Sequence, residues 1–272
     1  MKISCWGIAA SIGLGVSVLA CPAFADGYAS ACSGLPSQAA LKSALKSAVG
    51  VTGNGGLGFN MWGTLVANDG TVCAVAFSGS KYTDQWLGSR VISAQKANTA
   101  NDFSLSNGGP PSGTGLALST ANLYSAVQPG GSLYGLQHSN PVDTEVAYEG
   151  DASSWGTPAD PMVGKRIGGV NVFGGGLALY TQGGFKIGAV GVSGDTSCTD
   201  HMVAWRVRNT LKLDHLGTLG VVPGADSMHP DNIILDITVN PDGGTGISAK
   251  GFGHPTCLNN PTLSTLPPVR NP

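Results

Sequence analysis

The sequence predicts a mixed α/β fold of the α+β type, in which antiparallel hairpins alternate with helices. The first observation is that strand-like apolar runs flank two short segments, Asn68-Asp69-Gly70 and Gln182-Gly183-Gly184. The second is that both segments contain glycine, which accepts the positive φ that tight turns need. The third observation is that helical patterns precede, separate and follow these hairpins. The predicted order is therefore helix, strand, strand, helix, strand, strand, helix.

The first half of the chain begins with a helix over Leu35–Val49, where apolar residues recur at helical spacing before Gly50 ends the pattern. The strands Phe59–Ala67 and Val72–Ser78 follow as a hairpin. The alanine-rich segment Leu87–Phe103 is expected to form the next helix.

One face of this second helix is small and polar. At 100° per residue it groups a stripe of four side chains, Ser89, Ser93, Lys96 and Ala100. The stripe is either a solvated face or the wall of a pocket.

The second hairpin comprises Leu177–Thr181 and Phe185–Ser193. The latter strand is apolar or small on both faces, so we expect it to be covered on both sides. Its glycines at 188, 191 and 194 allow either a helix or a flat ligand to approach the backbone. Ser197 and Asp200 approximate a capping box that starts a helix running to about Leu213.

Two regions are poor in regular structure. Residues 104–176 are rich in Gly, Pro, Ser and Asn, and a segment of this kind is typically a functional cover. Within it, Leu116–Val127 is expected to be a short helix and Gly130–His138 an ordered loop or short strand. The C-terminal extension, residues 217–272, carries one expected strand, Ile233–Val239, followed by a turn at 240–244.

The N-terminus has the pattern of a secretory signal. Met1-Lys2, an apolar run and Ala23-Phe24-Ala25 match its three regions, which places the signal at residues 1–25 and one domain at 26–216. Val18–Cys21 offers a lipoprotein signal as the alternative. We expect an exported protein, periplasmic or secreted.

Composition excludes other classes of protein. Charged residues make up 11% and the net charge is −2, which provides no basic surface for nucleic acid. After the signal, no apolar run approaches the length of about 20 residues that a membrane span needs.

Four cysteines remain after the signal, which allows three disulfide pairings. If the first helix packs antiparallel on the first strand, its start lies near the beginning of the second strand. That geometry favours Cys32–Cys73 and leaves Cys198–Cys257.

Three motifs together resemble the GlcG/HbpS haem-binding family over roughly residues 35–213. They are Gly174-Gly175-Gly176, the Ile187–Gly194 strand with Asp200 after it, and the Ala94–Ala100 segment. The resemblance implies a three-layer, profilin-like α-β-α domain with a five-stranded antiparallel sheet, often assembled into homo-oligomers. It also implies binding of haem or a related tetrapyrrole. Here Asp84-Gln85-Trp86 replaces the family's usual Asp-Gly-Ala, and the family provides no single iron ligand that maps onto this sequence.

A haem site needs an axial ligand and cations for the propionates. His201, in the first turn of a helix, and His138, near Tyr134 in the insertion, are the candidate iron ligands; each is otherwise a surface or hydrogen-bonded histidine. The remaining binding candidates are Tyr134, Arg90, Lys96, Arg206, Ser193 and Gly194. These predict a site between the second helix, the glycine-rich strand end and the insertion.

The leading function is storage, transport or sensing of haem. The alternative is an enzyme or accessory subunit acting on a small organic molecule, with Lys96 as the base and Thr99 or Asp84 as its polar partner. A third is a structural partner in an exported complex. A hydrolase is disfavoured because Asp195 replaces the second glycine of Gly-x-Ser-x-Gly. His254 and Cys257 have metal-like spacing, but the expected disulfide consumes the thiolate.

Overall fold

The computed structural model describes residues 30–108, 113–238, 240, 242 and 246–271. The expected signal sequence and most of the expected turn at 240–244 lie outside the described residues. No helix within the described ranges is long and apolar enough to cross a membrane.

The main sheet consists of two antiparallel hairpins joined side by side. Its strands are β1 (Trp62–Ala67), β2 (Val72–Phe77), β3 (Gly176–Thr181) and β4 (Phe185–Ser193), in the order β2-β1-β4-β3. Both predicted hairpins are present, and β4 has the predicted bounds. β1 pairs with β4 from Trp62↔Ser193 to Ala67↔Gly188, which joins the two halves of the chain.

The expected fifth strand is wrong, because the main sheet has four strands among the residues that the structure describes. The chain after the last helix makes only an isolated bridge to β3, Tyr180↔Asp214. The expected strand Ile233–Val239 contributes only β5 (Ile237–Thr238), which pairs with β6 (Ile247–Ser248) in a separate two-stranded sheet.

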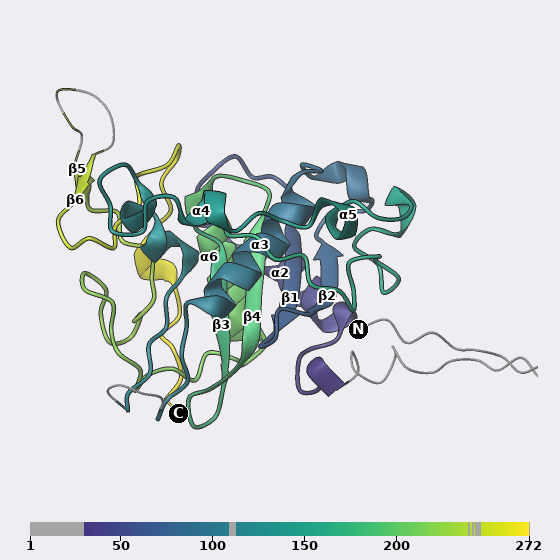
Figure 1. Ribbon diagram of the computed structural model, residues 1–272, viewed down its shortest axis with the longest axis horizontal. Coiled ribbons are helices and arrows are strands. Elements are labelled where there is room, and N and C mark those ends of the chain that lie inside the picture. Colours follow the sequence, from purple (N-terminus) through teal and green to yellow (C-terminus); the bar gives the residue numbers. More distant parts are fainter. Residues whose placement is uncertain (1–29, 109–112, 239, 241, 243–245, 272) are drawn as a thin grey trace, which may run out of the picture.

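Helices cover both faces of the main sheet and give three layers (Figure 1). α3 (Ser89–Asp102) packs on one face, and α2 (Gln38–Val49) and α6 (Ser197–Thr210) pack on the other. The capping-box prediction for α6 is wrong by one residue: Thr196 is the N-cap, and its hydroxyl accepts a hydrogen bond from the backbone N of Thr199.

Strand β4 is buried on both faces, as predicted. Val190 and Val192 pack in the core with α2 and α6, and Ala189 packs beneath α3. The register of β3 and β4 shifts between Leu179 and Tyr180. This irregularity interrupts the expected alternation, so that Lys186 reaches Asn101 of α3.

The glycines of the sheet let the backbone of α3 approach closely. A Cβ on Gly191 would lie 1.9 Å from the carbonyl O of Ser93, and one on Gly176 would lie 2.3 Å from that of Lys96. Of the three glycines at which we expected a helix or a flat ligand, only Gly191 is approached by the helix. Gly188 and Gly194 instead lie against the backbone of Val66 in β1 and of the residues just before this strand. The polar stripe on α3 is buried, so its interpretation as a solvated face is wrong.

The insertion folds as short turns over α3. The expected helix Leu116–Val127 is two 3₁₀ turns, η2 (Thr120–Leu123) and η3 (Ser125–Val127), and the loop Gly130–His138 leads into a one-turn helix. The other short helices are η1 (Tyr82–Asp84), α4 (Leu136–Ser139), α5 (Thr144–Ala147), η4 (Ala152–Ser154) and η5 (Leu263–Thr265).

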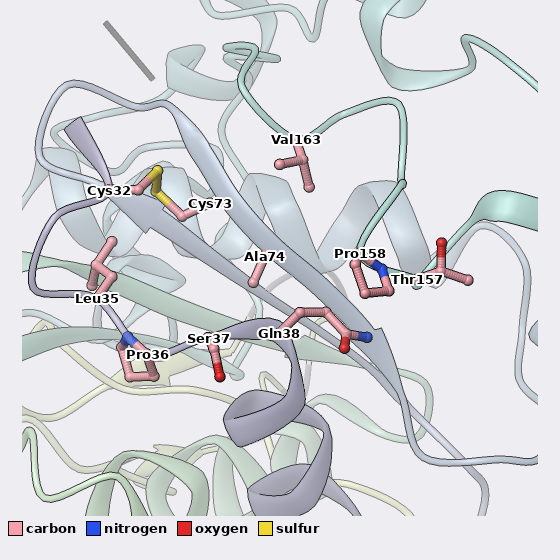
Figure 2. A pocket seen from close by; sticks show the side chains of 10 residues that line it. All are labelled: Cys32, Leu35, Pro36, Ser37, Gln38, Cys73, Ala74, Thr157, Pro158 and Val163. Atoms are coloured by element: carbon pink, nitrogen blue, oxygen red, sulfur yellow. A yellow bond between two sulfur atoms is a disulfide. The ribbon is translucent and has the colours of Figure 1, made fainter. Parts of the chain in front are cut away.

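Two disulfides fasten irregular segments to the sheet and its helices. Cys32–Cys73 ties the N-terminal segment to β2 (Figure 2), and Cys198–Cys257 ties the tail to the first turn of α6. These are the pairs that the sequence favoured. The tail also packs on the core, where Trp205 donates a hydrogen bond from Nε1 to the carbonyl O of Pro267.

Replacing Gly191 with Ala should destabilise the fold by about 1–3 kcal/mol, because the added methyl group forces α3 away from β4. Urea unfolding measures the difference. Gly88→Ala is the matched control, since a Cβ there meets no atom within 4 Å. Equal stability of the two variants would contradict the close-packing role of Gly191.

Candidate functional site

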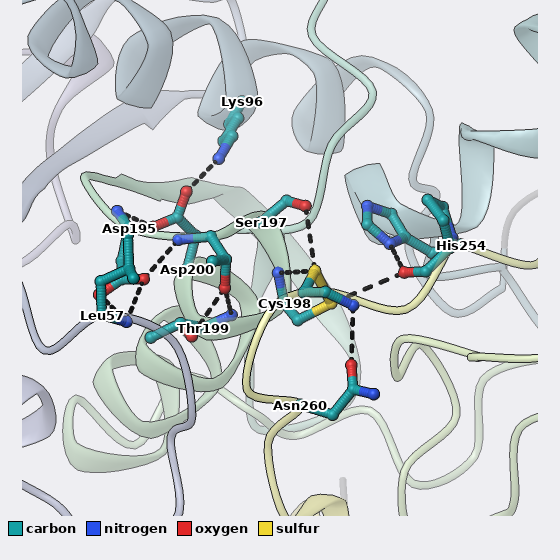
Figure 3. The surroundings of a disulfide bond; sticks show 12 residues. Leu57, Lys96, Asp195, Ser197, Cys198, Thr199, Asp200, His254 and Asn260 are labelled. Carbon is teal, nitrogen blue, oxygen red and sulfur yellow. Dashed lines mark hydrogen bonds and ion pairs between the residues drawn. A yellow bond between two sulfur atoms is a disulfide. The ribbon is translucent and has the colours of Figure 1, made fainter.

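Lys96 is part of α3 and was one of the predicted site residues. The predicted site lies between this helix, the end of β4 and the insertion. The Nζ of Lys96 is 2.7 Å from Oδ2 of Asp200 and 3.3 Å from the carbonyl O of Val192. Figure 3 shows this contact, and both charged side chains are at most 3% exposed. The ion pair thus connects a helix on one face of the sheet to a helix on the other.

The surroundings of Asp200 satisfy both of its oxygens. Its Oδ1 accepts a hydrogen bond from the backbone N of Asp195, whose own carboxylate accepts from the backbone N of Leu57 and Phe59. Burial raises the pKa of the Asp200 carboxyl to about 6, although Lys96 acts in the opposite direction. The two buried charges neutralise each other, and the ion pair holds α3 and α6 together through the sheet.

The expected partners of Lys96 are elsewhere. Thr99 donates its hydroxyl to the carbonyl O of Gln95 and accepts from the backbone N of Asn171. Asp84 accepts from the backbone N of Ser80. Lys96 and Asp200 therefore occupy one another, and the geometry does not bring Thr99 or Asp84 to the lysine amine.

The cations expected for haem propionates are also engaged. Arg90 is fully enclosed and binds both oxygens of Asp160, with Nε–Oδ2 at 2.9 Å and Nη2–Oδ1 at 2.5 Å. Its guanidinium stacks 4.5 Å from the ring centroid of Trp155. Arg206 donates to Asn54 and Thr265. These contacts serve structure, and they leave Arg90 inaccessible to a ligand.

His201 is 0% exposed, so it does not lie at the mouth of a pocket. Its Nε2 is 3.1 Å from Oδ1 of Asn232 and 3.1 Å from the backbone N of Ile233. Burial lowers the pKa of the imidazole to about 3, because a charged ring has little solvation there. Ser193 and Gly194 are buried as well, so this group of predicted ligand-binding residues is enclosed by protein.

The accessible predicted residues lie in the insertion instead. Tyr134 is 65% exposed, and His138 at the end of α4 is exposed too. Within the described ranges, the ring of His138 makes no hydrogen bond, and it alone of the five histidines is exposed. The structure thus separates the two predicted iron ligands, one buried and one at the surface.

The described residues also form cavities outside the predicted pocket, and two of them lie near features discussed above. A cavity of about 400 Å³ has a polar lining that includes Asp102, Arg166 and Ser139, the residue after His138 in the sequence. The exposed Arg166 pairs with Asp69 on the same cavity wall. A second cavity of about 310 Å³ borders the Cys32–Cys73 disulfide (Figure 2).

His254, which was set aside on the sequence alone, is a buried histidine beside the Cys198–Cys257 disulfide. A ring nitrogen of His254 and the sulfur atoms of Cys198 and Cys257 all lie within 4.8 Å of one another (Figure 3). His254 is 1% exposed, and burial lowers the pKa of its imidazole to about 4. Its spacing from Cys257 was the available signal, but spacing alone does not reveal the burial of the imidazole.

Comparison with known proteins identifies a family. The family model described as haem degrading protein, HbpS-like, matches residues 64–208, more than half of the chain. The chain is similar to the crystal structure of Klebsiella pneumoniae protein ORFY from the DUF336 family, with 24% identity and a TM-score of 0.40 over 65% of this chain and 90% of that one. It is also similar to the PduOC:heme complex, with 22% identity and a TM-score of 0.41 over 63% and 89% of the respective chains. None of the curated proteins matches the chain.

Replacing Lys96 with Met should cost about 3–5 kcal/mol, because it leaves the Asp200 carboxyl buried without its partner. The double replacement Lys96→Met with Asp200→Leu should recover part of that loss. Urea unfolding measures both. Lys46→Met, on the exposed side of α2, is the control and should change stability by less than about 0.5 kcal/mol. A Lys96→Met protein as stable as this control would refute the role of the pair.

His201 should weaken the fold at acid pH. Between its unfolded pKa of 6.5 and its folded pKa of about 3, the unfolded chain takes up a proton that the folded chain excludes. The free energy of unfolding then falls as pH falls, by up to about 1.4 kcal/mol per pH unit from this residue. The raised pKa of Asp200 acts in the opposite sense below about pH 6.

Comparison with His201→Gln isolates the histidine, because Asp200 remains in both proteins. Urea unfolding from about pH 7 to 4.5 should give a shallower pH dependence for the variant. Parallel pH profiles would show that His201 does not exclude the proton.

Proposed function

Because the chain belongs to the family of HbpS-like haem-degrading proteins, we propose that it is an exported protein that binds haem for storage, transport or sensing. Its site is at the surface of the insertion, with His138 as the iron ligand. The observation that carries this choice is the exposed His138 imidazole, which is engaged by no described residue. Imidazole is a common axial ligand of haem iron.

Neighbouring groups support a site at this surface. The exposed phenol of Tyr134 lies in the same segment, and Tyr is itself a haem ligand in some proteins. Arg166, beside the adjoining cavity, supplies a cation for a propionate. Its pair with Asp69 is solvent-exposed and therefore costs little to exchange.

The buried candidates do not fit a bound haem. His201, Arg90 and Lys96 are each enclosed and engaged within the protein, so they support the fold beneath the proposed site. For the same reason we do not favour Lys96 as a catalytic base. Three further parts of the proposal rest on the sequence. They are export directed by residues 1–25, a profilin-like fold and the formation of homo-oligomers.

Titration of the purified protein with hemin tests the proposal. We expect a shifted, saturable Soret band with one haem per chain in the ferric or ferrous state. His138→Ala should weaken binding by about tenfold or more, since the iron loses its axial ligand. His215→Ala is the control for loss of another imidazole, because the partly buried ring of His215 already contacts the carbonyl O of Asn271.

Each outcome is decisive for one part of the proposal. The absence of a Soret shift in either redox state would reject haem binding. Equal affinity in the wild type and His138→Ala would reject His138 as the ligand. With ascorbate as reductant, the Soret band of the bound haem should stay constant over time. Loss of this band would indicate that the protein degrades haem and does not store or transport it.

A further inference from the structure

The Cys198–Cys257 disulfide and His254 bring together the donors of a metal site. The two sulfur atoms and a ring nitrogen of His254 lie within 4.8 Å of one another, next to the start of α6 (Figure 3). Two thiolates and one imidazole form a donor set typical of zinc, with Zn–S near 2.3 Å and Zn–N near 2.0 Å. The sulfur atoms are now bonded to each other, so reduction is needed before they can bind a metal.

The hydrogen bonding of His254 leaves one of its ring nitrogens free to bind a metal. Its Nδ1 lies 2.7 Å from the carbonyl O of Pro255, and a carbonyl only accepts, so Nδ1 carries the hydrogen. The lone pair is then on Nε2, which is buried and has no hydrogen-bond partner among the described residues. A ligating histidine commonly donates its other N–H to a backbone carbonyl in this way.

The surroundings also favour the thiolate form of the cysteines. Cys198 lies in the first turn of α6, a helix of 14 residues, where the positive end of the helix dipole stabilises an anion. The backbone N of Cys198 is 3.2 Å from Sγ of Cys257 and donates to it. Cys257 is half-buried and Cys198 is buried, so we expect a reductant to approach the disulfide from the side of Cys257.

We propose that Cys198, Cys257 and His254 form a redox-gated zinc site, closed by the disulfide and opened by a dithiol reductant. The dithiol supplies two electrons and two protons, breaks the S–S bond and becomes a cyclic or protein disulfide itself. Zn²⁺ then displaces the two thiol protons and binds two thiolates and Nε2 of His254. The fourth position takes a water beside the hydroxyl of Ser197, which is 3.6 Å from Sγ of Cys257.

This site suits its buried position because its charges cancel. One Zn²⁺ balances two thiolates, and the imidazole is neutral, so the enclosed cluster carries no net charge. Reduction also leaves the tail attached near Cys257. Asn259 accepts from the backbone N of Gly56 and donates from its side chain to the carbonyl O of Gly56, and Thr262 donates from its backbone N to Gly53.

Zinc titration of the reduced protein tests the proposal, without hemin present. The double variant Cys32→Ser with Cys73→Ser keeps only the disulfide of interest. After reduction by a dithiol and its removal, this protein should bind one Zn²⁺ per chain by isothermal titration calorimetry. The same protein in its oxidised state should bind none. Co²⁺ in place of Zn²⁺ should produce the absorption of tetrahedral thiolate coordination.

Matched variants identify the ligands. Cys198→Ser with Cys257→Ser, made in the same Cys32→Ser, Cys73→Ser background, should bind no zinc after the same treatment. His254→Gln in the Cys32→Ser, Cys73→Ser background should weaken zinc binding by about tenfold or more. Its circular dichroism in the oxidised state shows whether it folds. Peptide mapping should also show that Zn²⁺ protects Cys198 and Cys257 from alkylation in the reduced Cys32→Ser, Cys73→Ser protein.

Three results would overturn the proposal. The first is that the reduced Cys32→Ser, Cys73→Ser protein binds no zinc, and the second is that its oxidised form binds zinc equally well. The third is that a folded His254→Gln protein binds zinc as tightly as the protein that keeps His254. The first two do not depend on the folding of any ligand variant. Because hemin is absent throughout, these results leave the haem proposal to its own test.

Discussion

The contact between the backbone of α3 and the glycines of β3 and β4 is the constraint on which the rest of the structure depends. At Gly176 and Gly191 there is no room for a side chain between helix and sheet. The helix therefore sinks onto the sheet, and the insertion closes over it. Polar groups that α3 carries into this layer must find partners inside the protein.

The partners are present at each of these positions. Ser93 is 2.7 Å from Thr64 of β1, Lys96 pairs with Asp200 of α6, and Arg90 pairs with Asp160 of the insertion. Each contact thus joins α3 to a different part of the fold. The small polar face that suggested a ligand pocket is instead the place where these parts are fastened together.

Local patterns in the sequence were sufficient for the framework. The strand periodicity and turn glycines predicted both hairpins, because neighbouring residues determine alternation and turn geometry. The disulfide pairing followed from the same framework. The fifth strand was not predictable in this way, since strand formation after Leu213 depends on how far the chain stays beside β3, where it makes only one bridge.

The site was harder to predict because burial depends on residues far away in the sequence. Arg90 and Asp160 are 70 positions apart, and Lys96 and Asp200 are 104 apart. No pattern in the neighbouring sequence indicates that Arg90 and Lys96 form ion pairs, or that His201 is buried. His138 and His201 were equivalent candidates in the sequence, and only the exposure of His138 in the structure distinguishes it from His201.

The positions of the disulfides have a consequence for the covalent organisation of the chain. Cys32–Cys73 lies entirely before the insertion and Cys198–Cys257 entirely after it, so neither of these two disulfides crosses residues 104–176. A single backbone cut in the insertion would produce two fragments, each with its own internal cross-link. The β1–β4 ladder and the helices on both faces would then hold the fragments together. The chain is thus organised as two complementary halves, suited to reassembly from separately produced polypeptides.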